Sequence, residues 1–302
     1  MADREMICTI QLSGLKMLHE FDRICKKYNI QYFAFAGTLL GAVRHHGYIP
    51  WDDDLDLGIF REDYEKLEKV PAGEWGEELE LLSPASPDPK HDKFFPRVYL
   101  KKSRIQSYKD VRDWKDPGTN KAWHTSLMID LYIFDEIPDD DNEFRRIRTV
   151  IQENKARYKV LKLKPNLHFQ FGKQYIKKVG KSIYGSIARM RYKEPWKKIY
   201  DESLREIRSG AKGSRSGSYY SNHEDMRFDK NDLFPLLEMD FEDMKIPVPH
   251  NYTDFLEVAY GKNYMEFPPE KDRYHINFIF ADLGNGTVLN IDPIPGSLGE
   301  KA

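Results

Sequence analysis

The feature that most constrains the fold is a run of aspartates that passes directly into an apolar alternation, Asp52-Asp-Asp-Leu-Asp-Leu-Gly-Ile-Phe60. Leu55, Leu57 and Ile59 recur at every second position, which is the period of a half-buried β-strand. The pattern predicts a strand over 55–60 with Asp54 and Asp56 on one face, about 7 Å apart. Because two carboxylates at this separation repel each other, we expect a divalent cation between them. Oxygen ligands favour Mg²⁺ or Mn²⁺ over zinc.

A glycine turn precedes the acidic run. Gly37 and Thr38 follow an aromatic strand predicted over 31–36 and lead into a predicted helix over 39–44. Glycine allows the backbone to approach a ligand closely, and the N–H groups at the start of a helix bind phosphate. Asp130 lies within an apolar strand predicted over 126–134. A charge there is costly unless it is paired or metal-bound, so Asp130 is the candidate third carboxylate.

Three alternatives stay open for these acids. Four aspartates in a short run are often a solvated loop. A calcium loop of the EF-hand type would need glycine where Leu57 stands and glutamate where Asp63 stands, which argues against it. Asp130 has the alternative role of a buried ion pair with a neighbouring arginine.

Composition limits the class of protein. At ~150 residues per domain, 302 residues make about two domains. The mean hydropathy of −0.69 excludes a multispan membrane protein, and no apolar run approaches the ~20 residues of a transmembrane helix. The chain has only two cysteines, and its first residues lack the apolar stretch of a signal peptide. We therefore expect a cytoplasmic protein.

The order of predicted elements indicates an α/β (α+β) fold. Strands and helices alternate in the first part, whereas long helical patterns occupy 142–160 and 171–200. We predict a catalytic core over 1–140. The remainder, 141–302, is predicted to contain a mainly helical basic region, a linker over 209–218 and a C-terminal segment that closes the site.

Charge is unevenly distributed. The range 144–198 contains 17 Lys and Arg but only two acidic residues, so the remainder of a chain with net charge −2 carries −17. The basic region is suited to anionic lipid or to a polyanionic glycan, while a solvated helical face is the simpler explanation. No recognised nucleic-acid motif accompanies it, so we expect no nucleic-acid partner.

The acidic segment resembles the LicD family of phosphocholine transferases, whose core motif is shared by the fukutin-type proteins. The similarity is carried by GTLLGAVRHHGYIPWDDDLDLGIFREDY, which begins at Gly37, and by MIDLYIFD, which begins at Met128. Weaker similarities follow in the expected order as FEDMKIPVP, YGKNYM and PPEKDRYH, so that the resemblance spans roughly residues 10 to 280.

The resemblance implies a nucleotidyltransferase-type core and a transferase. The expected reaction moves phosphocholine, or a related phospho-alcohol, from a CDP-choline-type donor to a sugar hydroxyl of a surface glycan such as teichoic acid or lipopolysaccharide. By position, Asp54, Asp56 and Asp130 would hold Mg²⁺ (or Mn²⁺), and Gly37 and Thr38 would hold a donor phosphate. Asp130 is also the candidate acceptor of the hydroxyl proton.

Further candidate substrate ligands flank these motifs. Arg44 could fork onto a diphosphate or pair with the local aspartates. His45 is either catalytic or an exposed residue at a helix end, and Trp51 either contacts choline through its ring or only packs against the turn. Arg273 and His275 form a second polar pair, with a structural role or a phosphate contact.

Two other functions remain open at this point. The chain could transfer a nucleotide from a nucleoside triphosphate, or it could be a degenerate glycan-binding module without activity. The three mutually repelling carboxylates argue against the binding module, because only a bound cation gives a reason to keep them together. A lipid-linked oligosaccharide acceptor would favour a peripheral position at the inner face of the cell membrane.

Overall fold

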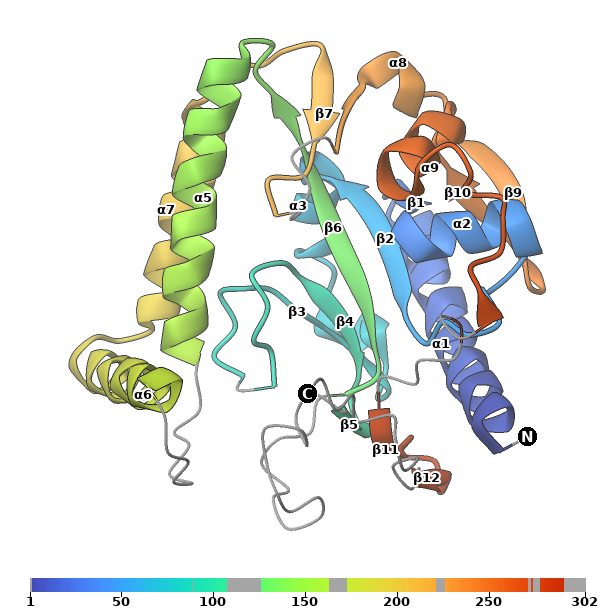
Figure 1. Ribbon diagram of the computed structural model, residues 1–302, viewed down its shortest axis with the longest axis horizontal. Coiled ribbons are helices and arrows are strands. Elements are labelled where there is room, and N and C mark those ends of the chain that lie inside the picture. Colours follow the sequence, from blue (N-terminus) through green and yellow to red (C-terminus); the bar gives the residue numbers. More distant parts are fainter. Residues whose placement is uncertain are drawn as a thin grey trace. The chain divides into compact units, whose positions relative to one another are not determined.

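The computed structural model describes residues 2–88, 90–107, 126–162, 173–220, 226–270, 273 and 278–290 (Figure 1). His275 and part of the basic range 144–198 lie outside the described residues. The fold is α+β, as the sequence predicts.

The first part of the chain alternates helices and strands. In chain order its elements are α1 (Ala2–Lys27), β1 (Tyr32–Ala34), α2 (Ala36–His45), β2 (Leu55–Phe60), α3 (Arg61–Leu67), the short 3-10 helix η1 (Ala72–Trp75), β3 (Leu79–Leu82), β4 (Arg97–Leu100), β5 (Arg104–Ser107) and β6 (Met128–Ile137).

Long helices follow, and short strands return near the end. These elements are α5 (Asp141–Lys162), α6 (Lys173–Arg191), α7 (Pro195–Ser209), β7 (Arg215–Gly217), β8 (Arg227–Asp229), α8 (Lys230–Leu233), β9 (Leu237–Phe241), β10 (Met244–Val248), α9 (Tyr252–Tyr260), β11 (Phe278–Asp282) and β12 (Val288–Asn290). Within the described residues no helix is both long and apolar enough to span a bilayer.

The largest sheet has the strand order β1-β2-β6-β4-β3, so β2 and β6 are direct neighbours (Figure 1). β1 runs antiparallel to β2, and β4 runs antiparallel to β6. Leu57, Ile59, Ile129 and Leu131 are completely buried. Their alternation with the aspartates places the acidic side chains on the opposite, accessible face of the same two strands.

The described residues group into two compact units. The first contains 1–81, 97–131 and 231–302, and the second contains 82–96 and 132–230. In the first unit, α1 packs on β1 through an edge contact between the rings of Phe21 and Tyr32, 5.1 Å apart. The residues that follow 230 thus group with the N-terminal part, while the sequence-based boundary at 140 stays a prediction.

The second unit is built around α5, whose buried side chains Phe144, Ile147 and Ile151 follow a helical spacing. The end of β6 pairs with β7, which pairs with β8. The linker predicted over 209–218 therefore contains a short strand. The helix predicted over 171–200 is two helices, because Glu194 adopts a left-handed conformation (φ 49°) and Pro195 begins α7.

Candidate active site

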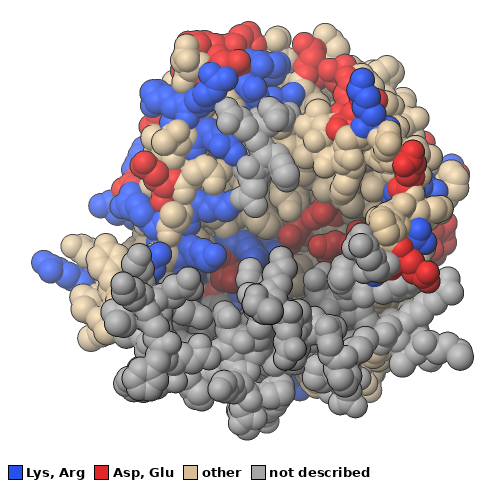
Figure 2. All heavy atoms as spheres, in the orientation of Figure 1, with Lys and Arg blue, Asp and Glu red and all other residues tan. Residues whose placement is uncertain are grey.

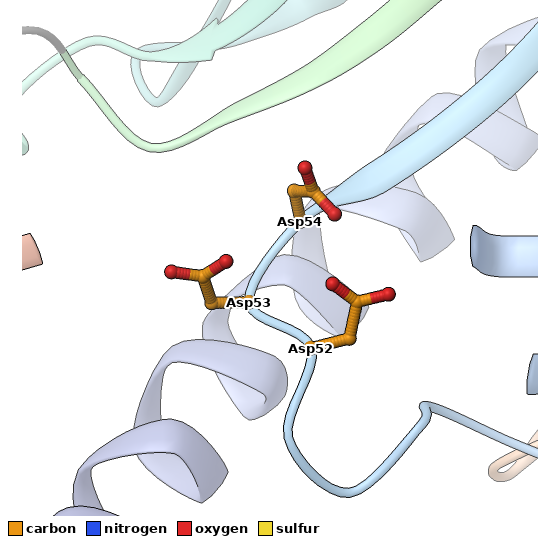
Figure 3. A group of neighbouring side chains, drawn as sticks. All are labelled: Asp52, Asp53 and Asp54. Atoms are coloured by element: carbon orange, nitrogen blue, oxygen red, sulfur yellow. The ribbon is translucent and has the colours of Figure 1, made fainter. Parts of the chain in front are cut away.

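A group of carboxylates gathers at the start of β2 (Figure 3). Asp52, Asp53 and Asp54 lie on the loop that enters this strand, and each offers one oxygen atom within 4.8 Å of the others. Among the described residues, this is the one such group of three metal-ligating side chains. Asp54 is exposed and Asp56, the second residue of β2, is half-buried, so a ligand can reach both.

The loop that carries the aspartates is held by the first helix. The Gln11 side chain on α1 donates hydrogen bonds to the carbonyl oxygens of Ile49, at 3.1 Å, and Asp52, at 2.8 Å. Gly37 faces the same loop, since a Cβ atom at this position would lie 2.6 Å from Oδ2 of Asp52. The glycine therefore leaves space for the Asp52 carboxylate.

Both residues of the glycine turn, Gly37 and Thr38, contact Asp56. The backbone N–H of Asp56 donates to the Thr38 hydroxyl at 2.8 Å, and Thr38 is buried. The backbone N–H of Gly37, in the first turn of α2, interacts with the Asp56 carboxylate. The role in phosphate binding that the sequence suggests for Gly37 and Thr38 stays a prediction, and the structure gives both residues a second role in orienting Asp56.

Asp130 stands beside Arg97 on the neighbouring strand. The two residues are cross-strand partners of β6 and β4. Arg97 Nε lies 2.6 Å from Oδ1 of Asp130, and a terminal nitrogen of Arg97 donates to Oδ2 at 3.1 Å. Both side chains are nearly buried, with 10% and 13% of their surface exposed. The ion-pair alternative for Asp130 is thus present in the structure.

Asp130 nevertheless shares the site with the other acids. Burial raises the pKa of Asp56 well above its usual range, and Asp130 is the charged neighbour that raises it most, while Arg97 lowers it. Although Asp54 is partly exposed, the surrounding protein removes water from its carboxylate, and this together with the charges of Asp56 and Asp52 raises the pKa of Asp54. The carboxylates of Asp56 on β2 and Asp130 on β6 therefore lie close enough for their charges to interact, on one face of the sheet.

A cluster of aromatic and cationic side chains contains four of the predicted substrate residues. The guanidinium of Arg273 stacks 5.3 Å from the centres of both the Trp51 and the Phe267 rings. Arg44 stacks on Phe267 at 5.3 Å, and the His45 ring contacts both aromatic rings. Burial, followed by the charges of Arg44 and His46, lowers the pKa of His45.

The two arginines of this cluster also bind the backbone. Arg44 donates to the carbonyl oxygens of Tyr264, at 2.8 Å, and Glu266, at 3.0 Å, and Arg273 donates to that of Pro268, at 2.6 Å. The contacts of Arg44 join α2 to the segment after α9, and the contact of Arg273 lies within that segment. Since the protein's own Arg273 lies over the Trp51 ring, a choline contact there would have to compete with it.

The sequence pattern alone does not assign three residues of this region to the site. Burial and the charges of Asp56, Asp52 and Asp54 raise the pKa of the Tyr260 hydroxyl, so Tyr260 is close enough to the acids for their charges to affect it. Gln11 and Phe267 hold the acidic loop and the aromatic rings, respectively. Tyr260 begins the motif YGKNYM, which was the available signal, whereas nothing in the sequence marks Gln11 or Phe267.

The geometry defines a class of site. Carboxylates from the two adjacent strands β2 and β6, beside the first turn of α2, are an arrangement that is found in phosphoryl-transferring enzymes.

Comparison with known proteins agrees with this class. Residues 29–176 match the family model described as the LicD/FKTN/FKRP nucleotidyltransferase domain, so this part of the chain is similar to the domain that defines the LicD family. The lipopolysaccharide cholinephosphotransferase LicD of Haemophilus influenzae is 26% identical over 286 residues, which cover 88% of this chain and 94% of that protein. The human ribitol 5-phosphate transferase FKRP is 47% identical over 47 residues, covering 16% of this chain and 10% of that protein.

Proposed function

We propose that this protein is a transferase that moves a phosphorylated alcohol onto a glycan hydroxyl. The observation that carries the proposal is the carboxylate group of Asp52, Asp53, Asp54 and Asp56, with Asp130 on the adjacent strand. The names of the relatives, a cholinephosphotransferase and a ribitol 5-phosphate transferase, support the same reaction class.

Phosphocholine is the alcohol phosphate that we propose first, with a CDP-activated donor such as CDP-choline. The relative that transfers phosphocholine aligns along nearly its whole length, whereas the ribitol phosphate transferase aligns over a short segment. The acceptor that we propose is a sugar hydroxyl of a cell-surface glycan, either lipopolysaccharide or teichoic acid.

The donor set fits a hard divalent cation. All the ligating atoms are carboxylate oxygens, which suit Mg²⁺ or Mn²⁺. Loss of water contact and the charges of neighbouring acids raise the pKa values of Asp54 and Asp56, and a bound cation would favour their ionised forms. We propose that Asp54 and Asp56 hold the ion, with Asp52 or Asp130 as a further ligand. A bound ion would neutralise charge on the donor diphosphate and stabilise the departing CMP.

The remaining roles belong to the chain's own side chains. Thr38 and the Gly37 N–H fix the orientation of Asp56, and Gln11 fixes the loop of Asp52. Arg97 orients Asp130, which we propose accepts the proton of the attacking hydroxyl. Arg273 lies over the ring of Trp51, the residue before the acidic run, and Arg44 lies beside Arg273, so we propose that this positive charge attracts the anionic donor.

The direct test is a donor screen with the purified full chain and Mg²⁺, read by mass spectrometry. CDP-choline, CDP-ribitol and CDP-glycerol are each offered together with glycan acceptors. We expect CMP and a glycan heavier by one phospho-alcohol with one of these donors. Release of pyrophosphate from a nucleoside triphosphate, with no reaction of any CDP-alcohol, would replace this function by nucleotide transfer.

A further inference from the structure

In the second compact unit, helix α6 presents large apolar side chains that are exposed among the residues that the structure describes. On α6, the exposed fractions of Ile183, Tyr184, Ile187 and Met190 are 56%, 66%, 56% and 87%. Tyr184, Ile187 and Met190 follow Ile183 by one, four and seven residues, and this spacing places all four side chains along one side of the helix. Large apolar side chains exposed together on one face mark an interaction surface rather than a core.

The opposite side of α6 explains why this face points outward. A Cβ atom on Gly185 would lie 2.5 Å from the carbonyl oxygen of Val160 on α5, and Ala188 is buried. Small residues therefore bring α6 against α5 on that side. The apolar stripe is left on the solvent side of a helix that is already packed.

The part of the chain that carries the stripe is rich in basic residues. The range 173–198 contains nine Lys and Arg residues and a single acid, Glu194. Lys181, Arg191 and Lys193 are exposed. Figure 2 shows uncharged side chains next to Lys and Arg at the lower left, where Figure 1 places α6.

A cavity of about 680 Å³ opens beside the same helix. Its wall combines apolar residues of α5, α6 and α7 with the cationic side chains of Arg157, Lys181, Lys193 and Lys198. The acid in its lining, Glu202, lies 3.5 Å from Arg157. An apolar cavity with a cationic rim is complementary to a molecule that has a hydrocarbon part and an anionic head.

We infer that α6 is an interfacial helix that docks this protein onto an anionic lipid bilayer, with the stripe Ile183, Tyr184, Ile187 and Met190 inserted among the lipids. Basic amphipathic helices bind membranes through buried apolar area and attraction to anionic headgroups. A second copy of the chain is a poorer occupant, because it would bring the same positive charges together. A polyanionic glycan would leave the apolar stripe in water.

The test is co-sedimentation of the full chain with vesicles, without metal or donor. Vesicles of phosphatidylcholine alone are compared with vesicles that contain about 30 mol% phosphatidylglycerol. We expect at least tenfold tighter binding to the anionic vesicles, and weaker binding in high salt because exposed charges are screened.

Matched variants separate the contributions. The pair Ile187→Ser and Met190→Ser should raise the vesicle dissociation constant at least tenfold, whereas Leu12→Ser, at a side chain of equal exposure (56%) on α1, should leave it unchanged. Lys181→Gln should weaken binding about fivefold, which corresponds to about 1 kcal/mol, and Lys16→Gln should not. Circular dichroism confirms that each variant is folded.

Several outcomes would overturn the inference. These are equal binding to neutral and anionic vesicles, unchanged binding of the double variant, or self-association of the chain that the double variant abolishes. The Asp56→Asn variant should bind vesicles like the wild type. A failure of vesicle binding therefore would not contradict the proposed transferase activity. A failure of the transferase assay likewise would not contradict membrane binding.

Discussion

At the scale of single residues, the neighbours of Asp56 shift its pKa in opposite directions. Burial, Asp130 and Asp52 raise its pKa, whereas Arg97 and the Gly37 N–H lower it. The raised pKa means that the negative form is disfavoured in the metal-free protein. A residue kept in this state costs folding stability, so its presence is better explained by a function than by packing.

Replacing Asp56 with asparagine should therefore separate stability from activity. We expect the Tm of the metal-free protein to rise by about 2 °C, because one repelling charge is removed. Turnover should fall by about 10³-fold or more. Glu77→Gln, at a side chain that is 93% exposed, is the control and should change neither quantity. Wild-type turnover by Asp56→Asn would remove Asp56 from the site.

Gly37 offers a steric test of the acidic loop. In Gly37→Ala the new methyl group would lie 2.6 Å from Oδ2 of Asp52, and this carboxylate can rotate away because it is the end of a side chain. We expect the free energy of unfolding to change by less than about 1 kcal/mol. Mg²⁺ affinity, measured by calorimetry, should fall about tenfold.

The control for this change is Gly73→Ala, where a Cβ atom would meet no atom within 4 Å. Equal Mg²⁺ affinity in both variants would show that Asp52 takes no part in holding the ion.

Some residue partners cannot be predicted from the sequence. The apolar alternation is enough to place Asp54 and Asp56 near one another, because they are two residues apart where the entry loop passes into β2. The partner of Asp130 depends on the register between β4 and β6, which are separated along the chain, so the sequence alone cannot select Arg97. The stacking of Arg273 on Trp51 cannot be predicted from the sequence either, because the two residues are also far apart along the chain.

At the scale of elements, the ion pair between Arg97 on β4 and Asp130 on β6 stabilises the pairing of these two strands. Arg97→Leu should lower the free energy of unfolding by about 3 kcal/mol, because Asp130 is left nearly buried without its partner. The double variant Arg97→Leu with Asp130→Leu should be more stable than Arg97→Leu alone. Urea denaturation measures both values, and equal stability of the single and double variants would contradict a coupled pair.

Elements were predictable where a local pattern decides them. The strand over 55–60 is confirmed residue by residue as β2, because its alternation is strict. The helical pattern over 171–200 forms two helices, α6 and α7, because Pro195 has no N–H to continue a helix and instead begins α7. The short strand β7 within the predicted linker pairs with β6 and β8, and a glycine- and serine-rich composition gives no sign of such pairing.

At the scale of the whole molecule, the raised pKa values of Asp54 and Asp56 make stability depend on pH. A carboxyl group with a higher pKa in the folded state binds more protons there than in the unfolded state. Its contribution is complete below the unfolded pKa of about 4 and is lost as pH rises through the folded pKa. The metal-free protein should therefore lose Tm as pH rises through this range.

Mg²⁺ should restore the lost stability, and more so at higher pH, because the ion binds the ionised carboxylates. Thermal scans from pH 4 upward, with Mg²⁺ or with chelator, measure the effect. The double variant Asp54→Asn with Asp56→Asn should show a smaller dependence on pH and no response to Mg²⁺. The assignment would be contradicted if the Tm of the metal-free wild type rose with pH and changed by the same amount as the Tm of the double variant.

The whole account depends on the binding of a divalent cation by carboxylates from β2 and its entry loop, a claim that calorimetric titration of the purified full chain with Mg²⁺ tests most directly. We expect saturable binding that releases protons and that Asp54→Asn and Asp56→Asn each weaken by about tenfold or more, while Glu77→Gln binds normally. Absence of Mg²⁺ and Mn²⁺ binding to the wild-type chain, or unchanged binding in both aspartate variants, would contradict the account.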